Sequence, residues 1–185
     1  FPPEILPVVK RVIHTTADFD YADNLVFSTG AVEKGIAAIK GGCTIVTDTQ
    51  MAFSGVNKRV LEKFGGRAVC FMSDPDVAAE AKARGETRAT VSMERAARLE
   101  GPLVLAIGTA PTALVRACEL IGAGELKPAL VIGVPVGFVN VVESKELLLT
   151  LDVPYIVARG RKGGSNVAAA ICNAMLYQAS NNARE

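Results

Sequence analysis

The sequence predicts a three-layer α/β/α domain, Rossmann-like, with a mainly parallel five-stranded sheet. Short apolar runs in the chain are continuous rather than alternating, which is typical of strands buried on both faces. Segments with helical spacing lie between these runs, as in successive βαβ units. The chain has 185 residues, of which 50% are hydrophobic. This length suits one well-buried core, so residues 1–185 are expected to form a single domain.

The predicted strands are apolar runs with glycine, proline or polar turn-forming residues at their ends. In chain order, they are expected at residues 44–47, 68–72, 103–107, 129–133 and 155–158. Helices are expected beside them because apolar residues recur there three and four positions apart. The predicted helices cover residues 32–39, 77–84, 93–99, 113–121, 141–149 and 167–176. Right-handed crossovers place such helices on both faces of a parallel sheet.

The charge balance and the apolar runs exclude several classes of protein. The 20 basic and 19 acidic residues give a net charge of +1, which argues against non-specific nucleic-acid binding. No apolar run approaches the ~20 residues that span a bilayer, so no membrane association is predicted. A signal peptide is not recognisable, and we expect a cytoplasmic protein. The chain starts at Phe1 rather than methionine, so further N-terminal residues are expected to be missing from it.

The four cysteines form no CxxC pair, and each lies in an apolar stretch: Cys43, Cys70, Cys118 and Cys172. We expect buried free thiols in a reducing compartment. One histidine and four scattered cysteines do not have the spacing of metal ligands, so no metal site is predicted.

The loops after the predicted strands are rich in glycine, proline and hydroxyl residues. Ligands of open α/β sheets bind outside the carboxyl ends of the strands. The strongest anion signal is the segment 159–165, in which two arginines and a lysine precede Gly163, Gly164 and Ser165 at a helix start. Guanidinium groups and helix N-termini both attract carboxylates. The alternative is a solvated basic turn in which Ser165 only caps the helix.

Two other segments are weaker candidates. The segment 108–114, GTAPTAL, is a ligand-facing turn or an ordinary βα loop. Gln50, Ser54 and Lys58 offer hydrogen bonds to a polar ligand, or they lie on the surface of a helix start. The chain lacks the G-x-x-x-x-G-K-[ST] and G-x-G-x-x-G patterns, which disfavours a nucleotide-binding domain and a nicotinamide cofactor.

His14 is the only histidine, and histidine ordinarily changes protonation near neutral pH. Thr15, Thr16 and Asp18 follow it closely and offer groups that orient an imidazole or a ligand. A lone histidine is more often structural, so this segment by itself leaves both roles open.

Six blocks together resemble the precorrin-8X methylmutase family of cobalamin biosynthesis. They are VIHTTADF (12–19), DTQM (48–51), GTAPTAL (108–114), GVPVGFV (133–139), ESK (143–145) and GRKGGS (160–165). They run across almost the whole chain in the family's order. Two features depart from the family: a further N-terminal segment is absent, and Thr109 stands where many relatives have asparagine.

The resemblance implies an isomerase that moves a methyl group from carbon eleven to carbon twelve of a contracted tetrapyrrole, without an organic cofactor. It places the catalytic histidine at His14, which would protonate or hydrogen-bond to the macrocycle. The substrate is fringed by carboxylates, and the residues that would bind it are Thr15, Thr16, Gln50, Ser54, Lys58, Arg161, Lys162, Gly163, Gly164 and Ser165. It also implies a homodimer with a site shared between both chains.

Two other functions compete with the enzyme. A non-catalytic tetrapyrrole carrier shares the binding features and differs at His14, whereas a generic nucleotide-binding domain lacks its fingerprints here. The sequence does not distinguish metal-free precorrin-8X from cobalt-precorrin-8 as the substrate.

Overall fold

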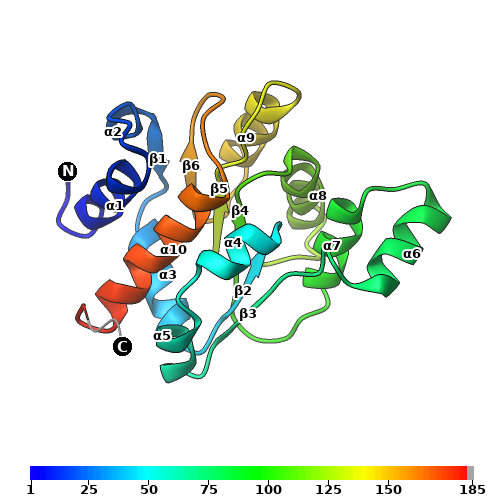
Figure 1. Ribbon diagram of the computed structural model, residues 1–185, viewed down its shortest axis with the longest axis horizontal. Helices are drawn as coiled ribbons and strands as arrows, with labels where there is room; N and C mark the ends of the chain where they lie inside the picture. Colours follow the sequence, from blue (N-terminus) through cyan, green and yellow to red (C-terminus); the bar gives the residue numbers. More distant parts are fainter. Residues whose placement is uncertain (183–185) are drawn as a thin grey trace.

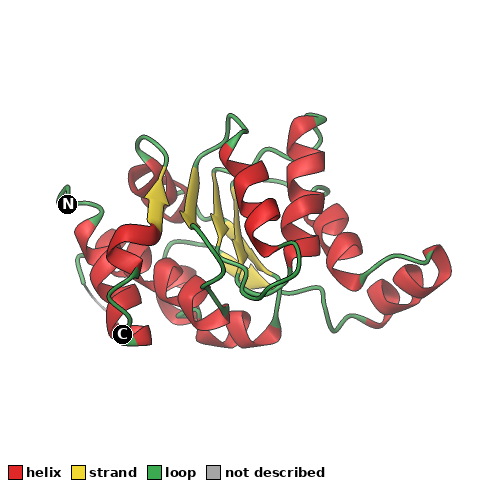
Figure 2. Ribbon diagram, turned by 90° about the horizontal axis from the view of Figure 1, so that it is seen from above, coloured by secondary structure: helices red, strands yellow, loops and turns green. Residues whose placement is uncertain are grey.

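Six strands form one sheet in the computed structural model, which describes residues 1–182 (Figures 1 and 2). They are β1 (Leu25–Phe27), β2 (Thr44–Thr47), β3 (Arg67–Val69), β4 (Leu103–Ile107), β5 (Leu130–Gly133) and β6 (Tyr155–Ala158). Their spatial order is β1-β6-β5-β4-β2-β3. Strands β2 to β6 are parallel, and β1 pairs antiparallel with β6.

The mainly parallel α/β/α fold is confirmed, but the predicted number of five strands is wrong. All five predicted strands are present. The sixth, β1, has only three residues and lies at the sheet edge, where Leu25 pairs with Ala158. A run this short carries no usable periodicity, which is why sequence reasoning missed it.

The six predicted helices are also present, and residues 1–182 contain four further ones. The ten are α1 (Leu6–Thr16), α2 (Tyr21–Asn24), α3 (Ala31–Lys40), α4 (Gln50–Gly55), α5 (Lys58–Lys63), α6 (Pro75–Arg84), α7 (Arg88–Ala96), α8 (Pro111–Gly122), α9 (Val141–Leu149) and α10 (Ser165–Ala179). Helix α7 begins five residues before its predicted start, because the Thr87 side chain caps it by accepting the Thr90 N–H.

Side chains of successive strand residues alternate between two cores, one on each face of the sheet. On one face Ile45, Val104, Ile132 and Ile156 pack with residues of α1, α3 and α10. On the other face their neighbours, such as Val46 and Leu105, pack with residues of α7, α8 and α9. Burial on both faces explains why the strand sequences are continuously apolar.

One helical hairpin lies at the periphery of the fold. The α6–α7 hairpin projects from the body of the molecule (Figure 1) and packs around a small cluster of Val77, Ala81 and Val91.

The four cysteines are free thiols. Three are buried as predicted, whereas Cys70 is half-buried. None of the helices in residues 1–182 has the length and apolar character needed to cross a bilayer.

Candidate functional site at the carboxyl ends of the strands

The turn after β4 is fixed by a buried carboxylate that follows β2. Asp48 has no exposed surface, and its two carboxylate oxygens accept hydrogen bonds from the N–H groups of Gly108, Thr109 and Ala110 at 2.7–2.8 Å. Burial raises the pKa of Asp48, and the three donors oppose this effect by favouring the charged form. Asp48 therefore acts as an anchor for the predicted ligand turn.

A cluster of three hydroxyl groups joins this turn to the start of α10. The Ser165 hydroxyl lies 2.7 Å from the Thr49 hydroxyl and 2.9 Å from the Thr109 hydroxyl. Gly164 occupies the N-cap position of α10, so Ser165 is not the side-chain cap of this helix. Ser165 instead connects the loops that follow β2, β4 and β6.

Two glycines allow these loops to pack closely. A Cβ atom on Gly108 would lie 2.6 Å from the carbonyl oxygen of Gly164, and a Cβ atom on Gly163 would overlap the carbonyl oxygen of Val134. The N–H of Gly164 donates to Val134 O at 3.0 Å. The glycine segment is therefore packed against the β5–α9 loop, and the Gly164 N–H is already used inside the protein.

We expect Gly163→Ala to destabilise the protein by about 1–3 kcal/mol, because the new methyl group meets rigid backbone. Thermal unfolding of the purified variant measures this loss. Gly122→Ala is the matched control, since a Cβ atom there meets open space at the end of α8. The control is expected to keep or slightly raise the unfolding temperature. Equal stability of the two variants would contradict the packing role of Gly163.

The basic side chains after β6 lie at the surface of this edge. Lys162 Nζ lies 2.7 Å from a carboxylate oxygen of Asp18 and 2.7 Å from one of Asp20. The hydrogen bond to Lys162 lowers the pKa of Asp18, and the two carboxylates raise the pKa of Lys162. The pairs tie the loop after α1 to the β6–α10 loop, orange at the top of Figure 1. Asp18 therefore pairs with Lys162.

Exposed apolar side chains stand beside these charges. The Arg161 guanidinium lies 5.9 Å from the centre of the Phe138 ring, and Phe138 itself is 85% exposed. Phe19, Met51 and Val139 are also largely exposed. They come from loops or helix starts at the same edge. A rim with both apolar and cationic groups suits a wide apolar ligand that carries carboxylates.

His14 lies in the last turn of α1 and is exposed. It makes no hydrogen bond to another of residues 1–182. It lines a hollow of about 440 Å³ together with Pro7, Lys10, Arg11 and Asn182. Within the described part of the chain, the lining of this hollow does not include Arg161. The ion pairs of Lys162 nevertheless place the end of α1 beside the β6–α10 loop.

The two hydroxyl residues after His14 differ in their surroundings. Thr15 is exposed. The Thr16 hydroxyl donates to Val12 O at 2.8 Å and accepts the N–H of Asp18 at 3.2 Å. Thr16 therefore closes the end of α1, where Ala17 adopts a left-handed conformation with φ 56°.

Sequence reasoning missed Lys10 and Arg11, which share the hollow with His14. Both lie three or four residues before His14 and therefore on the same side of α1. Recognition of α1 as a helix would have revealed them. The Arg11 guanidinium stacks 4.7 Å above the Tyr177 ring of α10, which holds its charge in place.

The predicted ligand residues after β2 fall into two groups. Gln50 and Ser54 are exposed on α4. Lys58 is half-buried, donates to the carbonyl oxygens of Phe53 and Val56, and lies 4.4 Å from the Phe53 ring centre. Burial lowers its pKa. Lys58 thus closes the end of α4, which is a structural role that sequence spacing did not reveal.

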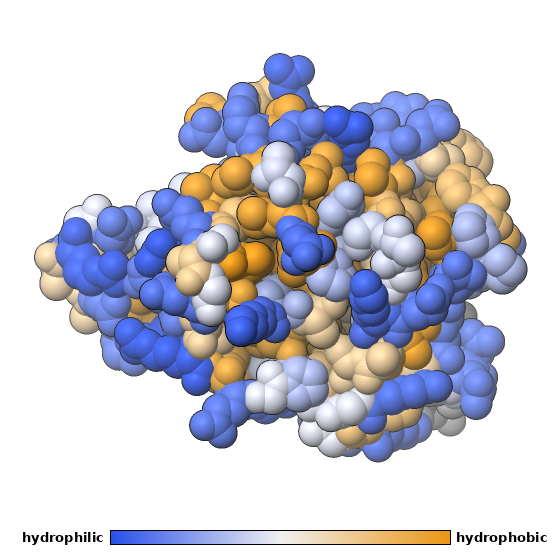
Figure 3. Space-filling model, turned by 180° about the vertical axis from the view of Figure 1, so that it is seen from behind, coloured by the Kyte–Doolittle hydropathy of each residue, from blue (hydrophilic) through white to orange (hydrophobic). Residues whose placement is uncertain are grey.

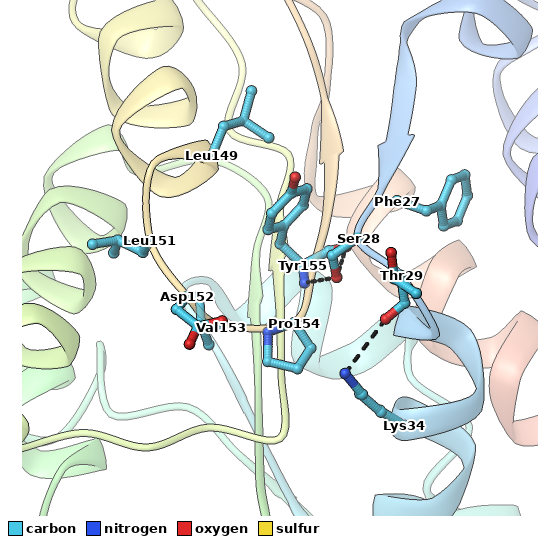
Figure 4. Close-up of a pocket in the computed structure, with 10 residues that line it drawn as sticks. All are labelled: Phe27, Ser28, Thr29, Lys34, Leu149, Leu151, Asp152, Val153, Pro154 and Tyr155. Atoms are coloured by element: carbon cyan, nitrogen blue, oxygen red, sulfur yellow. Dashed lines mark hydrogen bonds between the residues drawn. The ribbon is translucent and has the colours of Figure 1, made fainter.

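A hollow of about 400 Å³ lies at the opposite edge of the sheet, beside the amino end of β6 (Figure 4). The Ser28 hydroxyl there accepts the N–H of Tyr155 at 2.8 Å, and Lys34 donates to Thr29 O at 3.4 Å. The Ser28 and Lys34 side chains are thus hydrogen-bonded to backbone groups of the protein.

Across residues 1–182 no three histidine, cysteine or acidic side chains gather as metal ligands would.

Comparisons with known proteins agree with this arrangement. The family model for precorrin-8X methylmutase matches residues 1–178. The cobalt-precorrin-8 methylmutase of Priestia megaterium is 48% identical over 95% of this chain and 78% of its own length. The Salmonella typhimurium protein of the same name is 50% identical over 92% of this chain and 80% of its own length.

A solved structure gives the same result in three dimensions. The precorrin-8X methyl mutase of Thermus thermophilus superposes with a TM-score of 0.91 and 43% identity, over 98% of this chain and 88% of that one. Sequence and fold therefore agree along nearly the whole chain. The chain belongs to the precorrin-8X methylmutase family.

Proposed function

We propose that this protein is the isomerase that moves a methyl group from carbon eleven to carbon twelve of precorrin-8X or cobalt-precorrin-8 in cobalamin biosynthesis. The family membership supports the reaction. The observation that supports the site is the hollow on α1, where His14 lies beside Lys10 and Arg11. A proton donor beside two cations suits a macrocycle whose edge carries carboxylates.

In this mechanism His14 donates a proton or a hydrogen bond to the macrocycle, which makes the carbon that receives the methyl group electron-poor. The bond from the methyl group to carbon eleven breaks as the bond to carbon twelve forms, and the double bonds shift without net oxidation. A proton that His14 has donated returns to it as the product forms, so substrate and product are isomers. A positioned general acid typically contributes ~10²–10⁴-fold. Holding the ring in a reactive geometry supplies further acceleration.

Cations at the rim hold the carboxylates of the substrate in this proposal. Arg161 is exposed and carries no carboxylate partner among residues 1–182, so it is the strongest candidate of the β6–α10 loop. Lys162 would exchange Asp18 and Asp20 for a substrate carboxylate. Thr15, Gln50 and Ser54 are exposed donors that remain candidates.

Incubation with each of the two substrates tests the function and separates the enzyme from a carrier. Methyl migration alters the conjugated system, so the visible spectrum is expected to change with one substrate or both. A protein that binds the product but changes neither spectrum would be a carrier.

The four free thiols support a reducing, cytoplasmic compartment for the reaction.

We further propose a homodimer in which each active site draws residues from both chains. Hydrophobic residues gather across the upper middle of the face seen in Figure 3, with hydrophilic residues among and around them. Large exposed apolar areas often mark contacts between proteins. Within one chain, the lining of the hollow on α1 does not include Arg161. In the proposed dimer, the hollow of one chain and Arg161 of the other chain form one site.

Mixing two inactive variants tests the shared site. We expect His14→Ala and Arg161→Ala to be inactive or weak alone and to regain about a quarter of the wild-type activity after random exchange of subunits, since half of the dimers then hold one intact site. Sedimentation measures the dimer independently. No recovery from variants that exchange fully would place His14 and Arg161 of one site on the same chain.

A further inference from the structure

Lys145 on α9 is a buried lysine that the mechanism does not use. Its side chain has no exposed surface, and its Nζ donates to the carbonyl oxygens of Gly160 and Lys162, both at 2.8 Å. No carboxylate among residues 1–182 pairs with it. An ammonium group buried without a counter-ion costs free energy, so its presence in the core calls for a reason.

Both hydrogen bonds of the Lys145 ammonium group go to one loop. The carbonyl of Arg161, between the two that Lys145 binds, accepts the N–H of Gly137 at 3.2 Å. Three successive carbonyls, of Gly160, Arg161 and Lys162, are therefore bonded toward α9 and the β5–α9 loop. The side chains of Arg161 and Lys162 are exposed at the surface. The hydrogen bonds of these three carbonyls thus fix the positions from which the side chains of Arg161 and Lys162 extend.

We propose that Lys145 is a positioning residue, whose ammonium group holds the β6–α10 loop so that Arg161 and Lys162 meet the carboxylates of the substrate. This inference rests on the proposed function of the two cations. It assigns no contact between Lys145 and the substrate. The residue acts through the loop alone.

The charge state of Lys145 agrees with this role. Burial lowers its pKa to about 8, so the group is mostly charged at neutral pH and makes charge-assisted bonds to the two carbonyls. Several charged groups on the surrounding elements are paired with one another, whereas Glu143 of α9 and Arg161 of the loop form no ion pair within residues 1–182. The pairs are Glu146 with Arg159, Lys162 with Asp18 and Asp20, and Arg116 with Glu94 and Glu119.

Lys145→Met tests the proposal, because methionine keeps much of the length and lacks the donor. The KM for the substrate is expected to rise about tenfold, as for the loss of one charge-assisted hydrogen bond, with a much smaller change in kcat. Ser144→Ala is the matched control. Ser144 is equally buried, and its hydroxyl bonds only to Val141 O of its own helix. We expect this variant to keep the wild-type KM.

A double-variant comparison separates positioning from a general structural effect. In a protein that already lacks both cations (Arg161→Ala with Lys162→Ala), Lys145→Met is expected to raise KM by less than about threefold, because residues that act together are not additive. An equal, tenfold rise in that background would overturn the proposal. So would an unchanged KM in Lys145→Met alone.

Two further results complete the test. Lys145→Gln keeps one amide donor and is expected to have a KM between those of the wild type and Lys145→Met. Failure of both variants to fold, seen by circular dichroism, would assign Lys145 to fold stability and overturn the positioning role. Absence of turnover in the wild type would instead contradict the proposed function, and titration with product would then still report the effect of Lys145 on binding.

Discussion

Replacing His14 with alanine is expected to lower kcat for methyl migration by about 10²–10⁴-fold, the usual contribution of a general acid. Product affinity is expected to stay within a few-fold of the wild type. His14 is exposed and lies at the end of α1, so the free energy of unfolding should change by less than about 0.5 kcal/mol. Spectroscopic turnover assays and product titration measure the two effects separately.

Two further variants, one at His14 and one at Lys10, separate proton donation from substrate binding. His14→Asn keeps a hydrogen-bond donor that does not titrate, so residual activity in it reports how much catalysis needs a hydrogen bond alone. Lys10→Ala lies in the same hollow and is expected to raise KM while leaving kcat nearly unchanged, because a cation that binds carboxylates acts mainly on affinity. Normal kcat in His14→Ala would remove His14 from the mechanism.

The sequence predicted the parallel core of this fold because continuous apolar runs report burial on both faces. It did not reveal β1, whose position depends on pairing with β6 and not on its own three residues. Helices α4 and α5 were missed for a related reason. Each has six residues, fewer than two helical turns, so apolar periodicity has little room to develop.

The candidate site was predicted only as far as residue type and strand ends allow. The loops after β2, β4, β5 and β6 do come together, as the rule for parallel sheets requires. Sequence spacing did not reveal that Lys58 closes the end of α4 or that Lys162 pairs with Asp18. Asp18 is distant from Lys162 in the sequence, and the partners of Lys58 depend on the geometry of the turn between α4 and α5. The roles of Asp48 and Lys145 depend on burial in the tertiary structure.

Asp48→Ala is expected to destabilise the protein by about 3 kcal/mol or more. The substitution removes three hydrogen bonds to a charged acceptor and leaves the buried N–H of Gly108 without a partner. Chemical denaturation measures the loss. Asp74→Ala is the matched control, because Asp74 also follows a strand and precedes a helix, yet its side chain makes no capping bond. We expect that control to lose less than about 1 kcal/mol.

The same substitution should also weaken substrate binding, because the turn that Asp48 holds carries Thr109, whose hydroxyl bonds to Ser165 at the start of α10. Asp48→Asn keeps one oxygen that accepts two of the three N–H groups, so its loss of stability should be smaller. A stability of Asp48→Ala equal to that of Asp74→Ala would mean that water replaces the carboxylate. The close contact of Gly108 with Gly164 would then be the main restraint on this turn.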